Sequence, residues 1–163
     1  MRELRGIDFW TFPAAYRCIT TNGILRSDRR RAVMGKGVAL QAVHYAENIL
    51  KPPVDLELLL GAALTADGNH VHFLEPTNFI SFPTKNDWRR SSDLDLIRRS
   101  ALELRDVVFG ENAKIKLGPN DVILLPPPGC GNGGLSWPDV KPVLAEILRD
   151  DRFCVAVGEN AHT

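Results

Sequence analysis

The sequence predicts an α/β domain in which a mixed, largely buried sheet carries helices on both faces. From residue 30 onward, apolar runs of strand length alternate with segments of helical periodicity, and two strands are predicted before them. The 163 residues are enough for one substantial core, and no repeat, linker or low-complexity tract interrupts them. We therefore expect a single domain over residues 1–163.

The first part of the chain is predicted to form two strands and a helix. In order, these are a strand over residues 6–12, a strand over residues 16–21, and a helix that starts at the glycines of residues 35–37 and ends before Pro52. Residues 56–64 are apolar but have no clear period. We assign them no element.

The second part alternates strands and helices. The elements are a hairpin turn at residues 67–69, strands over residues 70–74 and 78–82, a helix with Ser92 as N-cap, a strand over residues 122–125, a helix from Pro138 with Ser136 as N-cap, and a strand over residues 153–157. Both N-caps have an aspartate three residues later, which is the spacing of a capping box. This order predicts that the strands are mostly buried between helices.

Composition excludes several classes of protein. Twenty basic and twenty acidic residues give a net charge of zero, so no global field attracts nucleic acid or membranes. We find no apolar membrane span and no signal peptide. Three widely spaced cysteines suit a reducing compartment, and we expect a cytoplasmic protein. The four histidines have no zinc spacing, so we expect neither a metal nor a cofactor.

Two glycine-rich segments, each at the start of a helix, predict an anion site. Gly129 to Gly134 connect an apolar strand to a helix, so backbone N–H groups and the helix N-terminus can face a phosphate. The alternative is a simple tight turn. The residues also fit G-x-G-x-x-G, but too little chain follows for a Rossmann unit.

Gly35-Lys36-Gly37 is the second segment, and two such loops suit a diphosphate. The alternative for Lys36 is an exposed position on the rim.

Two charged segments flank these loops. Arg26 to Arg31 contain four arginines, which we interpret as a solvated loop, with contact to a nucleic-acid backbone as the alternative. After the apolar strand at residues 78–82, the chain turns abruptly polar over residues 83–90. In α/β proteins, loops at strand ends build sites.

Three blocks of residues resemble one family. They are Thr20-Thr21-Asn22 followed by residues 33–39, Phe82-Pro83-Thr84-Lys85 with Trp88, and residues 128–135 with Trp137. Together they resemble the macro domain, an ADP-ribose-binding module. The branch they resemble most is that of the DarG antitoxin and the terminal ADP-ribose glycohydrolase, a pattern that small stand-alone phage proteins also carry. The blocks span most of the chain in the family's order.

The resemblance implies a three-layer α/β/α fold with a mixed central sheet and ADP-ribose across the strand ends. The ligand-binding residues that it implies are Asp8, Asn22, Gly35, Lys36, Gly37, Val38, Thr84, Gly129, Cys130, Gly131, Asn132, Gly133, Gly134 and Leu135. The two glycine loops would hold the diphosphate and the distal ribose, which Asn22 would also bind. Asp8 would bind adenine, although Gly6-Ile7-Asp8 is one residue out of step with the family's Gly-Asp pair. The insertion Ile24 to Arg31 departs from the family and leaves the geometry around Asn22 open; a lid or a partner contact are its alternatives.

Lys85 and Asn22 are the predicted catalytic residues. In the resembled branch, the lysine of the Phe-Pro-Thr-Lys block is needed to cleave the ADP-ribosyl bond. Desolvation or the cationic neighbours Arg89 and Arg90 would favour a neutral amine that attacks the opened ribose and forms a Schiff base. Alternatively, the ammonium stabilises developing charge, or it only neutralises phosphate on the rim. Cys130 lacks a histidine partner, so we interpret it as structural.

These inferences predict a hydrolase that removes ADP-ribose from a modified macromolecule with water as the second substrate. ADP-ribosylated thymidine in DNA is the first choice of substrate, and carboxylate-linked ADP-ribose on protein is the second. The alternatives are a non-catalytic ADP-ribose reader and a phosphatase acting on ADP-ribose 1″-phosphate. We expect a monomer.

Overall fold

The protein is a six-stranded mixed sheet between two pairs of helices, as the computed structural model of residues 1–159 shows; the last four residues of the predicted domain, 160–163, lie outside the described part. The strands are β1 (Arg2–Arg5), β2 (Tyr16–Thr21), β3 (His72–Phe73), β4 (Phe79–Pro83), β5 (Ile123–Leu125) and β6 (Phe153–Val157). The helices are α1 (Gly37–Asn48), α2 (Leu56–Asp67), α3 (Leu94–Phe109) and α4 (Trp137–Ile147), with a short 3-10 turn at Gly131–Gly133.

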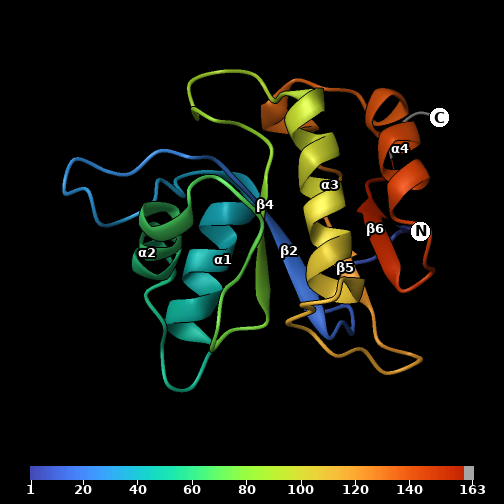
Figure 1. Ribbon diagram of the computed structural model, residues 1–163, viewed down its shortest axis with the longest axis horizontal. Coiled ribbons are helices and arrows are strands. Elements are labelled where there is room, and N and C mark those ends of the chain that lie inside the picture. Colours follow the sequence, from blue (N-terminus) through green and yellow to red (C-terminus); the bar gives the residue numbers. More distant parts are fainter. Residues whose placement is uncertain (160–163) are drawn as a thin grey trace.

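The strand order is β1-β6-β5-β2-β4-β3. Neighbouring strands are parallel except β3 and β4, which are antiparallel. Figure 1 shows α1 and α2 on one side of the sheet and α3 and α4 on the other. The predicted fold class, a three-layer α/β/α fold with a mixed central sheet, is confirmed.

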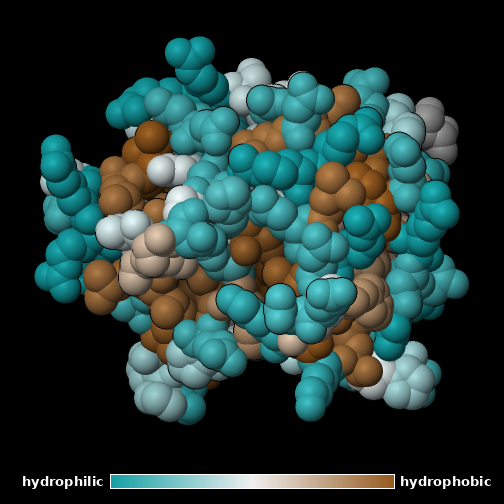
Figure 2. All heavy atoms as spheres, viewed as in Figure 1, coloured by the Kyte–Doolittle hydropathy of each residue, from teal (hydrophilic) through white to brown (hydrophobic). Residues whose placement is uncertain are grey.

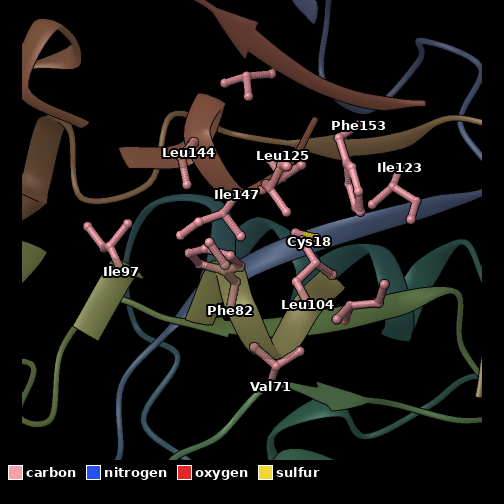
Figure 3. Packing of buried hydrophobic residues seen from close by; sticks show 14 of the residues in the cluster. Cys18, Val71, Phe82, Ile97, Leu104, Ile123, Leu125, Leu144, Ile147 and Phe153 are labelled. Carbon is pink, nitrogen blue, oxygen red and sulfur yellow. The ribbon is translucent and has the colours of Figure 1, made fainter. Parts of the chain in front are cut away.

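Alternate strand residues build a core on each face of the sheet. On β2, Cys18 packs toward α3 and α4, whereas Ile19 packs toward α1 and α2. We call the core on the side of α3 and α4 the first core and the core on the side of α1 and α2 the second. On β4, Phe82 belongs to the first core and Phe79 to the second. This follows from the two-residue period of a strand. Figure 3 shows Cys18 and Phe82 among the side chains of the first core, with Ile97 from α3 and Phe153 from β6.

The predicted strand over residues 6–12 is wrong, because β1 lies earlier, at Arg2–Arg5, and the following residues form turns. Two side chains form hydrogen bonds with backbone groups of residues 9–12, which in a strand would pair with a neighbouring strand. Asp8 Oδ1 accepts hydrogen bonds from the N–H groups of Trp10 and Thr11, both at 2.9 Å. The buried guanidinium of Arg17 donates to the carbonyl groups of Phe9, Trp10 and Phe12. The Asp8 contacts are local, but the Arg17 contacts come from β2 and leave no signal in the sequence of residues 6–12.

Replacing Arg17 with methionine is expected to lower the free energy of unfolding by about 2–4 kcal/mol, because the buried carbonyl groups lose charge-assisted donors. Arg17 is only 8% exposed. Urea denaturation measures the effect. The matched control is Arg30→Met at an exposed position, which we expect to change stability by less than about 0.5 kcal/mol. A loss below about 1 kcal/mol for Arg17→Met would contradict this role.

The structure also corrects predictions around α2. The unassigned residues 56–64 belong to this helix, whose N-cap Asp55 accepts a hydrogen bond from Leu58 N–H at 3.0 Å. The predicted hairpin turn at residues 67–69 is instead the end of α2, where Gly68 is the C-cap with φ of +86°. The strand predicted over residues 70–74 shrinks to β3, His72–Phe73.

Helix starts were predicted with mixed success. The N-cap of α3 is Asp93 rather than Ser92, since the Asp93 carboxylate accepts hydrogen bonds from the N–H groups of Asp95 and Leu96. Ser136 is the N-cap of α4 as predicted, but its hydroxyl donates to Asp139 Oδ2 instead of capping the backbone. Over residues 1–159, none of the helices has the length and hydropathy that crossing a membrane requires.

Candidate functional site

A cleft of about 790 Å³ lies where the carboxyl ends of β2, β4 and β5 meet. Because these strands are parallel and adjacent, the residues that follow them come together at one edge of the sheet. Asn22 follows β2, Thr84 and Lys85 follow β4, and Pro126 follows β5, and all four line the cleft. Its volume is that of a site for a molecule of nucleotide size.

The first glycine loop forms one wall of the cleft. Gly35, Lys36, Gly37 and Val38 all line it. Lys36 is the N-cap of α1 and makes no side-chain capping bond. The first N–H groups of a helix lack partners within the helix, and they carry partial positive charge. The wall therefore offers backbone donors to an anion.

The second glycine loop forms another part of the wall of the cleft. Gly129, Cys130, Gly131, Asn132 and Gly133 line the cleft. Gly129, Gly131 and Gly134 have φ of +76°, +72° and +79°, in the left-handed region that favours glycine. At the start of the loop, the Gly129 backbone packs closely against the Ile97 side chain: a Cβ on Gly129 would lie only 2.7 Å from Ile97 Cδ1.

Ser92 supports the second loop, although we predicted it only as an N-cap. Its N–H donates to the Gly133 carbonyl at 2.8 Å, and a Cβ on Gly133 would lie 2.3 Å from Ser92 Oγ. Ser92 also lines the cleft, and its buried hydroxyl has no hydrogen-bond partner within residues 1–159. The segment after β4 therefore shapes the loop after β5.

Asn132 and Lys85 connect the parts of the site. Asn132 Nδ2 lies 3.4 Å from the position that a Cβ on Gly37 would take, so the two glycine loops approach each other. Lys85 Nζ donates a hydrogen bond to the Asn132 carbonyl at 3.2 Å. The lysine amine thus lies beside the second loop, at the edge of the same cleft.

Asn22 lines the cleft although the insertion Ile24 to Arg31 follows it closely in the chain. Asn22 Nδ2 donates to the Val33 carbonyl at 2.9 Å, and Oδ1 accepts from Ile24 N–H at 3.0 Å. The N–H of Val33 donates to the Ile24 carbonyl, which closes the neck of the insertion. Asn22 keeps a second Nδ2 hydrogen for a ligand.

Three predicted ligand-binding residues lie outside the lining of the cleft: Asp8, Gly134 and Leu135. Backbone N–H donors of Thr11 and Trp10 hold the pKa of Asp8 below its usual value. Its carboxylate organises the turn after β1, and its role toward adenine stays a prediction. Gly134 and Leu135 close the second loop, since Leu135 N–H bonds the Gly129 carbonyl at 3.0 Å.

Cys130 is a wall residue of the cleft rather than an activated thiol. Burial raises the pKa of its thiol, and the nearby Asp139 carboxylate adds to the shift. A thiol needs a lowered pKa to act as a nucleophile near neutral pH. The interpretation of Cys130 as structural agrees with this.

The lining includes residues that sequence reasoning did not assign to the site: Thr20, Thr21, Val33, Met34, Ala39, Trp88, Arg89, Ser92, Pro126 and Pro127. Most of them adjoin a predicted site residue in the chain. The abrupt polar stretch over residues 83–90 was the available signal for Arg89, and the family block that includes Trp88 was the signal for that residue. Within residues 1–159, the His, Cys, Asp and Glu side chains form no group of three or more that could hold a metal ion.

Comparison with known proteins gives relatives of one kind. No family model matches the chain. The DNA ADP-ribosyl glycohydrolase of Thermus aquaticus is 34% identical over 120 residues, which are 71% of this chain and 31% of that protein. The protein of the same name from Mycobacterium tuberculosis is 34% identical over 121 residues, 72% of this chain and 32% of that protein. The chain therefore spans about a third of the length of these relatives.

Solved structures agree. The macrodomain of Mycobacterium tuberculosis DarG superposes with a TM-score of 0.65 at 23% identity, covering 96% of both chains. The macrodomain of Thermus aquaticus DarG gives 0.63 at 25% identity, covering 97% of both. Thermosipho africanus DarTG in complex with ADP-ribose gives 0.68 at 19% identity, covering 99% of this chain and 43% of that one.

The six-stranded mixed sheet, its flanking helices and the cleft at the strand ends define a macro domain. More closely, this chain is a DarG-like macro domain, as its three sequence blocks predicted.

Proposed function

We propose that the chain binds ADP-ribose in the cleft and acts as an ADP-ribosyl glycohydrolase. The observation that carries the proposal is the meeting of Lys85, Asn22 and both glycine loops in one cleft of suitable size. The names of the sequence relatives, and the bound ADP-ribose of one structural neighbour, support it.

Each part of the site has a role in this proposal. The backbone N–H groups of the two glycine loops bind the diphosphate from opposite sides. Asn22 uses its free Nδ2 hydrogen on the distal ribose. Lys85 lies beside the anomeric carbon, where the bond to the leaving group breaks and water supplies the hydroxyl of the released ADP-ribose. The lysine assists either as an amine through a Schiff base or as a charge that stabilises the transition state.

We propose ADP-ribosylated thymidine in DNA as the preferred substrate, before carboxylate-linked ADP-ribose on protein. The sequence relatives are named for activity on DNA. The exposed arginines of the insertion also suit a polyanion. We propose that the protein acts as a monomer. The free thiols of Cys18, Cys130 and Cys154 support a location in the cytoplasm.

The test is incubation of the protein with an ADP-ribosyl-thymidine oligonucleotide and with a glutamate-modified protein, side by side. We expect release of free ADP-ribose, faster from the oligonucleotide, and none with Lys85→Ala. Binding of ADP-ribose without release from either conjugate would indicate a reader. Release of inorganic phosphate from ADP-ribose 1″-phosphate, with both conjugates intact, would indicate a phosphatase.

We further propose that the insertion contacts the DNA backbone. The loop is fixed on α2: Arg26 pairs with Glu57 at 2.6 Å, Arg31 pairs with Asp55 at 2.7 Å, and the Arg30 carbonyl lies against Gly61. Arg29 and Arg30 are exposed. Their side chains have no partner among residues 1–159. Figure 2 shows hydrophilic side chains protruding at the left end of the molecule, where Figure 1 places this loop.

Replacing Arg29 and Arg30 together with serine is expected to weaken binding of a single-stranded oligonucleotide about three- to tenfold and to reduce the salt slope of log Kd by about 1.4. The reason is the loss of two phosphate-binding cations. Fluorescence anisotropy at several salt concentrations measures both quantities. Arg105→Ser, near the far end of α3, is the control and should change neither. Unchanged affinity and slope in the double variant would exclude this loop from the DNA contact.

A further inference from the structure

Trp88 is an exposed aromatic side chain in the lining of the cleft. It is 44% exposed, although it lines the cleft with Lys85. The other two tryptophans use their indole N–H groups within the fold: Trp137 donates to Glu3, and Trp10 donates to Gln41. Within residues 1–159, the Trp88 indole has neither a hydrogen-bond partner nor an aromatic neighbour in stacking contact. An exposed indole beside a cleft indicates a contact surface.

Arg89 completes a flat, cationic surface with Trp88. Its guanidinium carbon lies 4.7 Å from the centroid of the Trp88 ring, the geometry of a cation–π contact. The same guanidinium binds both carboxylate oxygens of Asp87, at 3.2 and 3.3 Å. Arg89 is thereby held on the indole, and both residues line the cleft.

The turn that carries Trp88 is fixed at its base. The Asn86 carbonyl accepts from Gly23 N–H at 3.2 Å, and Asn69 Nδ2 donates to the Lys85 carbonyl at 3.0 Å. Within the turn, Asp87 Oδ1 accepts from Arg89 N–H at 2.9 Å. Figure 1 shows this segment as the loop between β4 and α3, at the edge of the sheet where β4 ends. Trp88 is thus held three residues from Lys85, before any ligand arrives.

We infer that Trp88, backed by Arg89, stacks on the nucleobase that carries the ADP-ribosyl group and so selects nucleobase conjugates over carboxylate conjugates. The inference rests on the proposed hydrolase function. Lys85 lies at the anomeric carbon in that proposal, so the leaving group lies next to the segment after β4. A thymine ring offers a planar face to an indole, whereas a glutamate side chain does not. Stacking of bases on aromatic side chains contributes substantially to binding without hydrogen-bond readout.

The test compares the wild type, Trp88→Ala and Trp88→Phe on the thymidine-linked oligonucleotide and on the glutamate-linked protein. We expect Trp88→Ala to lower kcat/KM on the oligonucleotide about 10- to 100-fold and on the protein conjugate less than about threefold. Trp88→Phe should recover most of the loss, because the aromatic face returns. The Kd for free ADP-ribose, which has no base beyond the distal ribose, should stay within about twofold for both variants. Thermal melts establish that the variants are folded.

Other outcomes separate this inference from the proposed function. Equal losses on both conjugates, a failure of phenylalanine to recover activity, or a weaker Kd of Trp88→Ala for free ADP-ribose would overturn the stacking role. The last result would mean that Trp88 contacts adenine. Wild-type activity on the protein conjugate alone would also overturn it. If the wild type released ADP-ribose from neither conjugate, the hydrolase function itself would fail.

Discussion

Replacing Lys85 with alanine is expected to reduce the release of ADP-ribose at least about 100-fold. Within residues 1–159, no other amine is held beside the second glycine loop by a contact like that with Asn132. The Kd for ADP-ribose should rise by less than about threefold, since the backbone N–H groups of the two loops supply most of the proposed contacts. Single-turnover assays measure the chemical step, and calorimetry measures the Kd.

Lys36→Ala is the matched control for this prediction. Lys36 also lines the cleft, but it lies between the glycines of the first loop. Its loss should affect binding more than the chemical step. If Lys85→Ala kept the wild-type rate, or if both variants lost activity in proportion to their weaker binding, a catalytic role for Lys85 would be excluded.

Lys85→Arg separates the two chemical roles of the lysine. An arginine keeps the positive charge but cannot form a Schiff base. A residual rate about a tenth of the wild type would indicate electrostatic stabilisation. Loss equal to that of the alanine variant would favour chemistry of the amine.

Replacing Gly129 with alanine is expected to lower the free energy of unfolding by about 2–4 kcal/mol. The residue has φ of +76°, which an L side chain adopts only under strain. A Cβ would also lie 2.7 Å from Ile97 Cδ1 and 2.9 Å from Leu135 Cδ1, so the core below the loop would have to move. Urea denaturation measures the change.

Gly35→Ala provides a matched control in the other loop. Gly35 does not have a positive φ, and a Cβ there would meet no atom within 4 Å. Stability should therefore change by less than about 0.5 kcal/mol. The methyl group adds to the wall of the cleft, so a weaker Kd for ADP-ribose is expected at unchanged stability. Equal destabilisation by both substitutions would show that contacts below Gly129 do not fix the second loop.

Local patterns in the sequence were enough for most of the fold. β2 and β6 were predicted with their observed bounds, and α3 was recognised from its helical periodicity. The helix α2 was missed because its own residues are apolar on most sides, so the sequence has no single apolar face with helical period. One of these sides carries Gly61, which packs against the insertion. The strand at residues 6–12 was wrong because the Arg17 guanidinium binds that backbone from another element.

The site was predictable where its residues form short motifs. Both glycine loops, Asn22 and Lys85 belong to such motifs, and the structure brings them to one cleft. The support of Gly133 by Ser92 was not predictable, because it joins two loops that are far apart in the sequence. The exposure of Trp88 also depends on the tertiary fold.

A crystal structure of the protein with bound ADP-ribose tests the central claim most directly. The diphosphate should lie within hydrogen-bond distance of N–H groups in both residues 35–38 and residues 129–134, with Lys85 Nζ next to the anomeric carbon of the distal ribose. A diphosphate away from both loops, or Lys85 turned out of the cleft toward solvent, would contradict the account.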